Sequence, residues 1–148
     1  MSKITGSATL EVKYTIKRVR STTKEVRGEL VVDGETGRFD LSIPILSFLS
    51  SDTDFDQHMR EVTEVKLYPI ARGTGEILKS ALATKKSTVD VLIDFHGVKK
   101  HYPVQLENNG ALASFTIDLE AHKIKRPSML GIKIKNEVLM SFNLNWGA

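Results

Sequence analysis

The side chains that could carry chemistry in this chain are few and scattered. His58 and Glu61 form an H-x-x-E spacing, which places two metal-ligating groups on one face of a helix. The other histidines, His96, His101 and His122, fall at the ends of separate predicted strands, so no second cluster supplies further ligands. We therefore predict no metal site and interpret His58 as a structural or surface residue.

The sequence also lacks the short motifs that organise many catalytic sites. Cysteine is absent, which excludes a thiol nucleophile, a thiolate metal site and a disulfide. There is no G-x-S-x-G elbow, no P-loop and no G-x-G-x-x-G after a strand. Asp54 and Asp56 suit the first turn of a helix, where their charges offset the helix dipole, better than they suit an acid–base pair. The prediction is a non-enzyme without catalytic residues or a cofactor.

The elements that would position these side chains are mainly strands. Apolar residues recur at every second position in nearly every segment, which is the pattern of a strand with one buried face. Eight such runs are bounded by turn residues: 7–17, 25–33, 39–45, 67–78, 89–95, 98–106, 113–119 and 138–146. Their spacing is typical of an all-β antiparallel domain. We expect one eight-stranded antiparallel barrel, forming a single domain over residues 1–148.

The alternation is interrupted only between residues 51 and 66. Ser51 or Asp52 can cap a helix there, and Phe55, Met59 and Val62 recur at helical spacing. One short helix, about residues 53–65, is therefore predicted between the third and fourth strands. We expect its apolar stripe to lie across a mouth of the barrel as a lid.

The apolar faces of the strands supply the residues expected to point into the barrel. They are Leu10, Val12, Tyr14, Phe39, Leu41, Ile43, Val91, Ile93, Phe95, Tyr102, Val104, Phe115, Ile117, Met140, Phe142 and Leu144. An eight-stranded barrel is wide enough either to be filled by its own side chains or to hold one slender ligand. An open barrel would bind an apolar guest at these positions. A filled barrel would act as a non-catalytic interaction or scaffold module.

Binding of an apolar chain in such a tunnel is energetically reasonable. Burying about 15 methylene-sized groups at about 0.8 kcal/mol each gives roughly 12 kcal/mol before the costs of association. Those costs are on the order of 4 to 15 kcal/mol, so micromolar affinity is expected and tighter binding needs a polar anchor. Tyr14, Tyr102 and His58 are the candidate anchors, although a tyrosine on an apolar face is more often a core residue with its hydroxyl at the rim.

Basic residues gather near two predicted turns, although the net charge is only +3. One group lies within residues 17–27 and the other within 123–135. A solvated surface is the simpler interpretation, and transient contact with an anionic membrane or polymer is the alternative. Nucleic-acid-binding barrels need exposed aromatics among the basic residues, whereas here the aromatics follow the apolar face, so we expect no nucleic-acid partner.

The first residues, MSKITGSATL, contain no apolar stretch of signal-peptide length. No segment approaches the roughly 20 apolar residues that cross a bilayer. Read as written, the sequence predicts a cytoplasmic protein. A mature exported chain with a replacement initiator methionine would look the same, so a periplasmic location is the alternative.

Three stretches together resemble the YceI-like family. Residues 47–69 are similar to its strand, serine-rich turn, helix and aromatic-Pro return to the sheet, at Ser47, Phe48, Asp56, His58, Met59, Tyr68 and Pro69. Residues 90–107 are similar to its turn and Pro-containing strand, at Gly97, Val98, Lys99 and Pro103. Residues 114–144 are similar to its closing hairpin, at Phe115, Asp118, Pro127 and Val138.

The resemblance spans essentially the whole chain and implies a bacterial, lipocalin-like barrel. It further implies sequestration or transport of a long apolar lipid of the polyisoprenoid or fatty-acyl type. Members often pair as homodimers, although a closed barrel has no free sheet edge to indicate the pairing surface. The chain departs from the family in lacking the export signal that members commonly carry and in having a short loop between its first two strands.

Overall fold

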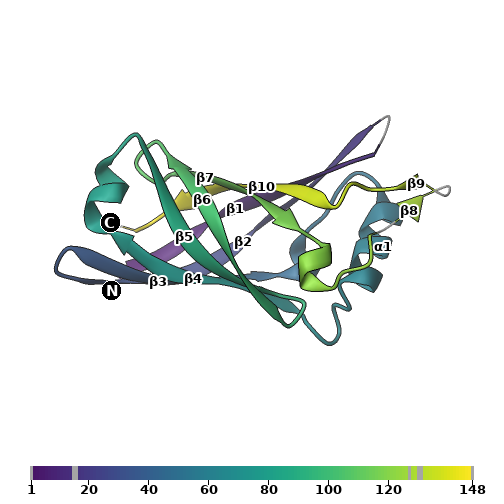
Figure 1. Cartoon of the computed structure of the whole chain (residues 1–148), viewed down its shortest axis with the longest axis horizontal. Coiled ribbons are helices and arrows are strands. Elements are labelled where there is room, and N and C mark those ends of the chain that lie inside the picture. The colour runs from purple at the N-terminus through teal and green to yellow at the C-terminus, as the bar shows by residue number, and fades with distance from the viewer. Residues whose placement is uncertain (1, 15–16, 127, 130–131, 148) are drawn as a thin grey trace.

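Eight strands close into an antiparallel barrel in the computed structural model, which describes residues 2–14, 17–126, 128–129 and 132–147 (Figure 1). The barrel strands are β1 (Ser2–Lys13), β2 (Arg18–Asp33), β3 (Thr36–Pro44), β4 (Ile70–Leu78), β5 (Lys86–Phe95), β6 (Val98–Glu107), β7 (Leu112–Asp118) and β10 (Glu137–Asn145). They neighbour one another in the order β1-β10-β7-β6-β5-β4-β3-β2. The predicted antiparallel barrel is confirmed.

Shorter elements complete the described part of the chain. The helix α1 (Thr53–Val62) lies between β3 and β4, as predicted. Three short 3₁₀ turns are η1 (Ile45–Ser47), η2 (Lys79–Ala83) and η3 (Glu120–His122), and β8 (Ser128–Met129) pairs with β9 (Ile132–Lys133) in a separate small hairpin. Figure 1 shows α1 and this hairpin at one end of the elongated barrel and both chain termini at the other. We call these the helix end and the termini end.

The helix α1 is held at its start by a side-chain cap. The carboxylate of Asp52 accepts a hydrogen bond from the Phe55 N–H at 3.0 Å, which satisfies one of the free donors of the first turn. The helix ends at Val62, earlier than the predicted residue 65, because Glu64 takes a left-handed conformation with φ 49°. Within the part of the chain that the structure describes, no helix is long and apolar enough to span a membrane.

The strand β2 begins at Arg18, well before the predicted residue 25. Its early inner face carries the buried polar residues Ser21 and Thr23, so the apolar signal is missing there. The alternation also shifts by one position, because Val26 pairs with Gly6 whereas Thr23 pairs with Ala8 across a β-bulge. Because the inner face is polar there and the alternation then shifts by one residue, the sequence pattern did not identify the first half of this strand.

Other strand boundaries differ from the predictions at the barrel rims. The strand β1 starts at Ser2 and ends at Lys13, whereas the predicted run was 7–17. Thr15 and Ile16, which belonged to that run, lie outside the described residues. The strand β4 begins at Ile70, so Leu67, Tyr68 and Pro69 precede the sheet rather than forming part of it.

The glycines of β4 lie close to neighbouring strands. A Cβ atom on Gly75 would lie 2.8 Å from Phe39 Cζ and 2.9 Å from the Asp90 carbonyl oxygen. Gly73 has more room, since a Cβ there would lie 3.4 Å from both Ile93 Cδ1 and Val91 Cγ1. The inner face of β4 is therefore nearly free of side-chain volume beside the barrel centre.

Candidate functional site

The barrel encloses a cavity of about 140 Å³ with almost entirely apolar walls. A single buried water needs only about 10–15 Å³, so this space is far larger than a packing defect. Every barrel strand contributes to its lining, from Leu10 on β1 to Leu144 on β10. Along β4 the lining consists of Ala71, Arg72 and Gly73, and the small size of Ala71 and Gly73 leaves space there.

The cavity is closed at the termini end by Trp146. Its indole N–H donates to the Gly110 carbonyl at 2.8 Å, and its ring meets Phe39 edge-on at a centroid distance of 5.9 Å. The indole nitrogen is thus satisfied by the β6–β7 turn, while the ring forms part of the lining. An occupant entering from the helix end would meet this ring at the far end of the cavity.

The helix α1 covers the cavity at the helix end. Met59, Arg60 and Thr63 belong to the lining, together with the buried Asp56. The Asp56 carboxylate accepts hydrogen bonds from Ser50. The Ser50 backbone nitrogen lies 3.1 Å from both carboxylate oxygens, and the Ser50 hydroxyl lies 2.7 Å from Oδ1. The predicted position of the helix across a barrel mouth is confirmed.

Two other polar side chains of the lining, Thr63 and Arg60, differ in whether they have a polar partner. The Thr63 hydroxyl donates to the Met59 carbonyl at 2.7 Å, so it is satisfied within the helix. The half-buried Arg60 has no carboxylate within ion-pair distance among the described residues. Arg60 is therefore an unpaired cation at the edge of an apolar space, and it can meet a polar or anionic end of an occupant.

Both ends of α1 are fastened to the barrel by polar contacts. At its start, the Lys17 ammonium lies 3.6 Å from the Asp52 carboxylate. Beyond its end, Glu64 Oε1 lies 2.7 Å from His96 Nε2, and His96 Nδ1 lies 2.9 Å from the His122 carbonyl oxygen. Both ring nitrogens of His96 thus lie within hydrogen-bond distance of an oxygen atom, which holds the ring in place. This contact joins the helix to the β5–β6 hairpin.

The comparisons with known proteins agree with this architecture. A family model described as the YceI-like domain matches residues 3–146. The chain belongs to this family. No curated protein matches the chain.

Solved structures similar to this YceI-like chain have the same fold. A polyisoprenoid binding domain from Saccharophagus degradans, implicated in plant cell wall breakdown, has 16% identity and a TM-score of 0.72, with 97% of each chain covered. BcnA of Burkholderia cenocepacia has 18% identity and a TM-score of 0.70, with 94% of each chain covered. The Campylobacter jejuni YCEI protein has 17% identity and a TM-score of 0.58, covering 76% of this chain and 75% of that one. At these identities the similarity shows a shared fold.

Most of the inward positions predicted from the sequence do line the cavity of this YceI-like barrel. They are Leu10, Phe39, Leu41, Ile43, Val91, Ile93, Phe95, Val104, Phe115, Ile117, Met140, Phe142 and Leu144. The YceI-like barrel with this apolar lining supports the binding of an apolar ligand. Contact of these residues with a ligand stays a prediction.

Three of the positions predicted to point into the barrel are not part of the cavity lining. Val12 and Tyr14 are buried and Tyr102 is half-buried, but none of the three lines the cavity. Val12 packs fully into the core near the helix end, and Tyr14 follows the last residue of β1, where its N–H donates to the Lys17 carbonyl in the β1–β2 turn. Burial raises the pKa of Tyr14. Tyr14 and Tyr102 are therefore not part of the cavity lining, and their role as polar anchors stays a prediction.

Tyr102 lies outside the cavity lining because it belongs to a buried polar network. The Nδ1–H of the fully buried His122 is directed at the carbonyl oxygens of Phe95 and Val98, each at 3.0 Å. His122 Nε2 is then the acceptor for the Tyr102 hydroxyl at 2.7 Å. Burial lowers the pKa of His122 and raises that of Tyr102, which favours the neutral forms of both. The network fixes η3 against the β5–β6 hairpin.

The remaining candidate, His58, is half-buried on α1 and is not part of the cavity wall. Across the described residues, no group of three metal-ligating side chains is brought together. Sequence reasoning also missed several lining residues, including Ser21, Phe48 and Trp146. Trp146 belongs to the predicted strand 138–146 and follows its apolar alternation, so it could have been identified. Ser21 is polar, so the apolar pattern does not indicate it.

Proposed function

We propose that this protein holds a long apolar molecule, of the polyisoprenoid or fatty-acyl type, inside its barrel and thereby sequesters or transports it. The observation that carries the proposal is the apolar cavity to which all barrel strands contribute. Such a space favours a slender hydrocarbon, because the wall offers few hydrogen-bonding groups. The similar fold of a domain that is named for polyisoprenoid binding supports this class of ligand.

The polar groups of the lining lie toward the helix end and support one orientation of the ligand. Ser21 of β2, Asp56 and Arg60 of α1, Thr63 directly after α1 and Arg72 near the start of β4 lie toward that end, whereas the other end is formed by Trp146 and apolar residues. A hydrocarbon tail directed at Trp146 would leave its polar end beside Arg60. The cavity also favours a carrier over the alternative of a filled scaffold barrel.

Extraction of the purified protein into organic solvent, followed by mass spectrometry, tests the proposal. We expect a co-purifying long-chain lipid, or saturable uptake of an added fluorescent acyl probe by the delipidated protein. Competition by unlabelled lipids of different chain length then identifies the preferred class. Neither a bound lipid nor uptake of the probe would contradict the proposed function.

A further inference from the structure

We propose that the helix end docks on the surface of an anionic lipid bilayer, which places the cavity mouth against the source of its ligand. This inference rests on the proposed function, since it explains how an apolar molecule reaches the cavity without crossing water. It depends on three properties of the helix end: exposed apolar side chains, unpaired cations and the position of the cavity mouth.

Large apolar side chains are exposed on the two segments that connect α1 to the barrel. Leu46 and Leu49 precede the helix and are 54% and 59% exposed, and Leu67, which follows it, is 69% exposed. The two segments lie side by side, because the Ile45 N–H donates to the Pro69 carbonyl at 2.9 Å. Exposed leucines around a cavity mouth are suited to enter the interfacial layer of a membrane.

The segment that precedes α1 also forms part of the cavity wall. Ile45 and Phe48 line the space, while Leu46 and Leu49, which alternate with them, are exposed. The exposed apolar surface is therefore separated from the apolar interior by a single layer of chain. A ligand that leaves a bilayer at this point would have a short path into the cavity.

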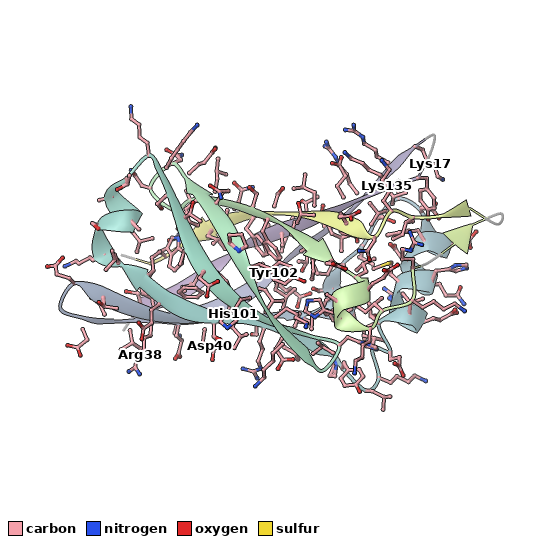
Figure 2. The ribbon with its side chains drawn as sticks, in the orientation of Figure 1. Lys17, Arg38, Asp40, His101, Tyr102 and Lys135 are labelled. Carbon is pink, nitrogen blue, oxygen red and sulfur yellow. The ribbon has the colours of Figure 1, made fainter. Side chains whose placement is uncertain are left out.

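The charges at the helix end favour an anionic surface. At the helix end, the described cations that have no carboxylate within ion-pair distance are Lys13, Arg18, Arg60, Lys66, Lys99, Lys100, Lys123, Lys125 and Lys135. Figure 2 shows Lys135 at this end, together with Lys17, whose ammonium is paired with Asp52. Fewer carboxylates at this end lack a cation within ion-pair distance, namely Asp54, Asp56, Glu61, Asp94, Asp118 and Glu137. Two of them, Asp56 and Asp118, accept hydrogen bonds from Ser50 and Asn136. A surplus of lysine and arginine is attracted to anionic lipids.

The termini end provides the contrast. It also exposes apolar side chains, with Val31 at 41% and Leu78 at 61%, so apolar exposure alone does not choose between the ends. Its charges are balanced, because Lys3, Arg38, Lys79, Lys85 and Lys86 accompany Glu29, Asp33, Glu35, Glu76 and Glu107. Trp146 moreover closes the cavity on that side. Charge and access to the cavity together select the helix end.

Co-sedimentation with vesicles tests the charge component. Vesicles of phosphatidylcholine alone are compared with vesicles that also contain phosphatidylglycerol, and we expect clearly tighter binding to the anionic set. The triple variant Lys123→Gln, Lys125→Gln, Lys135→Gln should bind the anionic vesicles roughly 100-fold more weakly, at about fivefold for each lysine. The matched variant Lys79→Gln, Lys85→Gln, Lys86→Gln removes the same charge from the termini end and should bind as the unaltered protein does.

Apolar substitutions test the second component. Leu46→Ser with Leu67→Ser should weaken vesicle binding on the order of tenfold, because both side chains lose their burial in the interface. Val31→Ser with Leu78→Ser is the control at the termini end and should have no such effect. Equal losses from both ends, or equal binding to neutral and anionic vesicles, would overturn the docking proposal. Circular dichroism establishes that each variant is folded.

Uptake of the acyl probe from detergent-free solution separates this proposal from the proposed function. Probe uptake without vesicle binding would contradict docking and leave the carrier function intact. Vesicle binding without probe uptake would contradict the carrier function while supporting a membrane-binding surface. When both are present, the helix-end variants should slow transfer of the probe from vesicles without changing its affinity in solution.

Discussion

Gly73 is the residue whose lack of a side chain contributes most directly to the open space. A Cβ atom at this position would touch Val91 and Ile93 at 3.4 Å, which is an ordinary contact distance, so larger side chains extend from there into the cavity. The fold itself does not require glycine here in the way that Gly75 is required by Phe39 and the Asp90 carbonyl. The two glycines of one strand therefore have different roles.

Gly73→Leu should remove ligand binding while leaving the barrel folded. The added side chain occupies part of a cavity of about 140 Å³, so we expect probe affinity to fall at least about tenfold. Titration of the fluorescent acyl probe measures this change, and the Thr74→Leu variant on the opposite face of β4 is the control. Unchanged affinity in a folded Gly73→Leu protein would mean that the ligand does not pass β4.

His122 gives the protein a predictable dependence on pH. Burial lowers its pKa in the folded state, whereas the unfolded chain has the ordinary value of about 6.5. Between these two values the unfolded state binds more protons, so the free energy of unfolding falls as the pH decreases through about 6.5. The contribution is fully present above that pH.

Urea unfolding between about pH 8 and about pH 5 should therefore show a falling midpoint, and His122→Gln should flatten the dependence while lowering stability at every pH. His101→Gln, which removes an exposed imidazole, is the control and should retain the slope. A slope that survives in His122→Gln would assign the pH dependence to another group.

At the scale of elements, the contact between Glu64 and His96 holds the end of α1 to the β5–β6 hairpin. Both residues have left-handed backbone conformations, with φ 49° and 56°, which non-glycine residues rarely adopt. Their side chains meet at 2.7 Å, and the His96 side chain is only 9% exposed. This contact fixes the lid helix at its C-terminal side.

A double-mutant cycle with Glu64→Gln and His96→Asn should give a coupling energy of about 1 kcal/mol in urea unfolding. Release of the acyl probe should also become faster in each single variant, because α1 is less firmly held. The pair of His101 and Asp90 is the matched control, since it has the same 2.7 Å separation but both side chains are about two-thirds exposed. We expect that control to show nearly no coupling. Equal coupling in the two cycles would contradict a structural role for Glu64.

The elements also show where sequence patterns were informative. Strict alternation of apolar residues identified β3, β5, β6, β7 and β10 almost to their ends, because each has one face toward the cavity. The first half of β2 gave no such signal, since Ser21 and Thr23 face inward and a bulge follows them. Thr23 is accommodated by a hydroxyl contact of 2.6 Å with Ser47, a partner that no local pattern indicates.

The same limit applies to the candidate site. Positions on the wall followed from alternation, but Tyr102 shares that alternation and is withdrawn from the cavity by its hydrogen bond to His122. The partners are 20 residues apart, so only the folded barrel reveals the contact. The open cavity itself depends on how Ala71 and Gly73 face larger residues across the barrel, which residue types alone left undecided.

At the scale of the whole molecule, the barrel has one end covered by a fastened helix and one end closed by Trp146. A ligand chain that enters from the helix end gains free energy with each buried methylene, about 0.8 kcal/mol, until it reaches the indole. Carbons beyond that length stay in water and add nothing. For the proposed ligand, the distance between the two ends of the barrel would therefore set the length of chain that is bound.

Thermal unfolding with a series of fatty acids should reveal this limit. At a ligand concentration 100 times the dissociation constant, binding stabilises the folded state by about 2.7 kcal/mol, which corresponds to a rise in Tm of roughly 5–10 °C for a chain of this size. The rise should increase with chain length and then level off. In Trp146→Leu, which shortens the side chain at the closed end, the plateau should move to longer chains, whereas Leu112→Ser on the outer surface of the same end should leave it in place. A plateau at the same length in Trp146→Leu would mean that the ligand tail is not directed toward the termini end, because only a tail in contact with the indole can sense its removal.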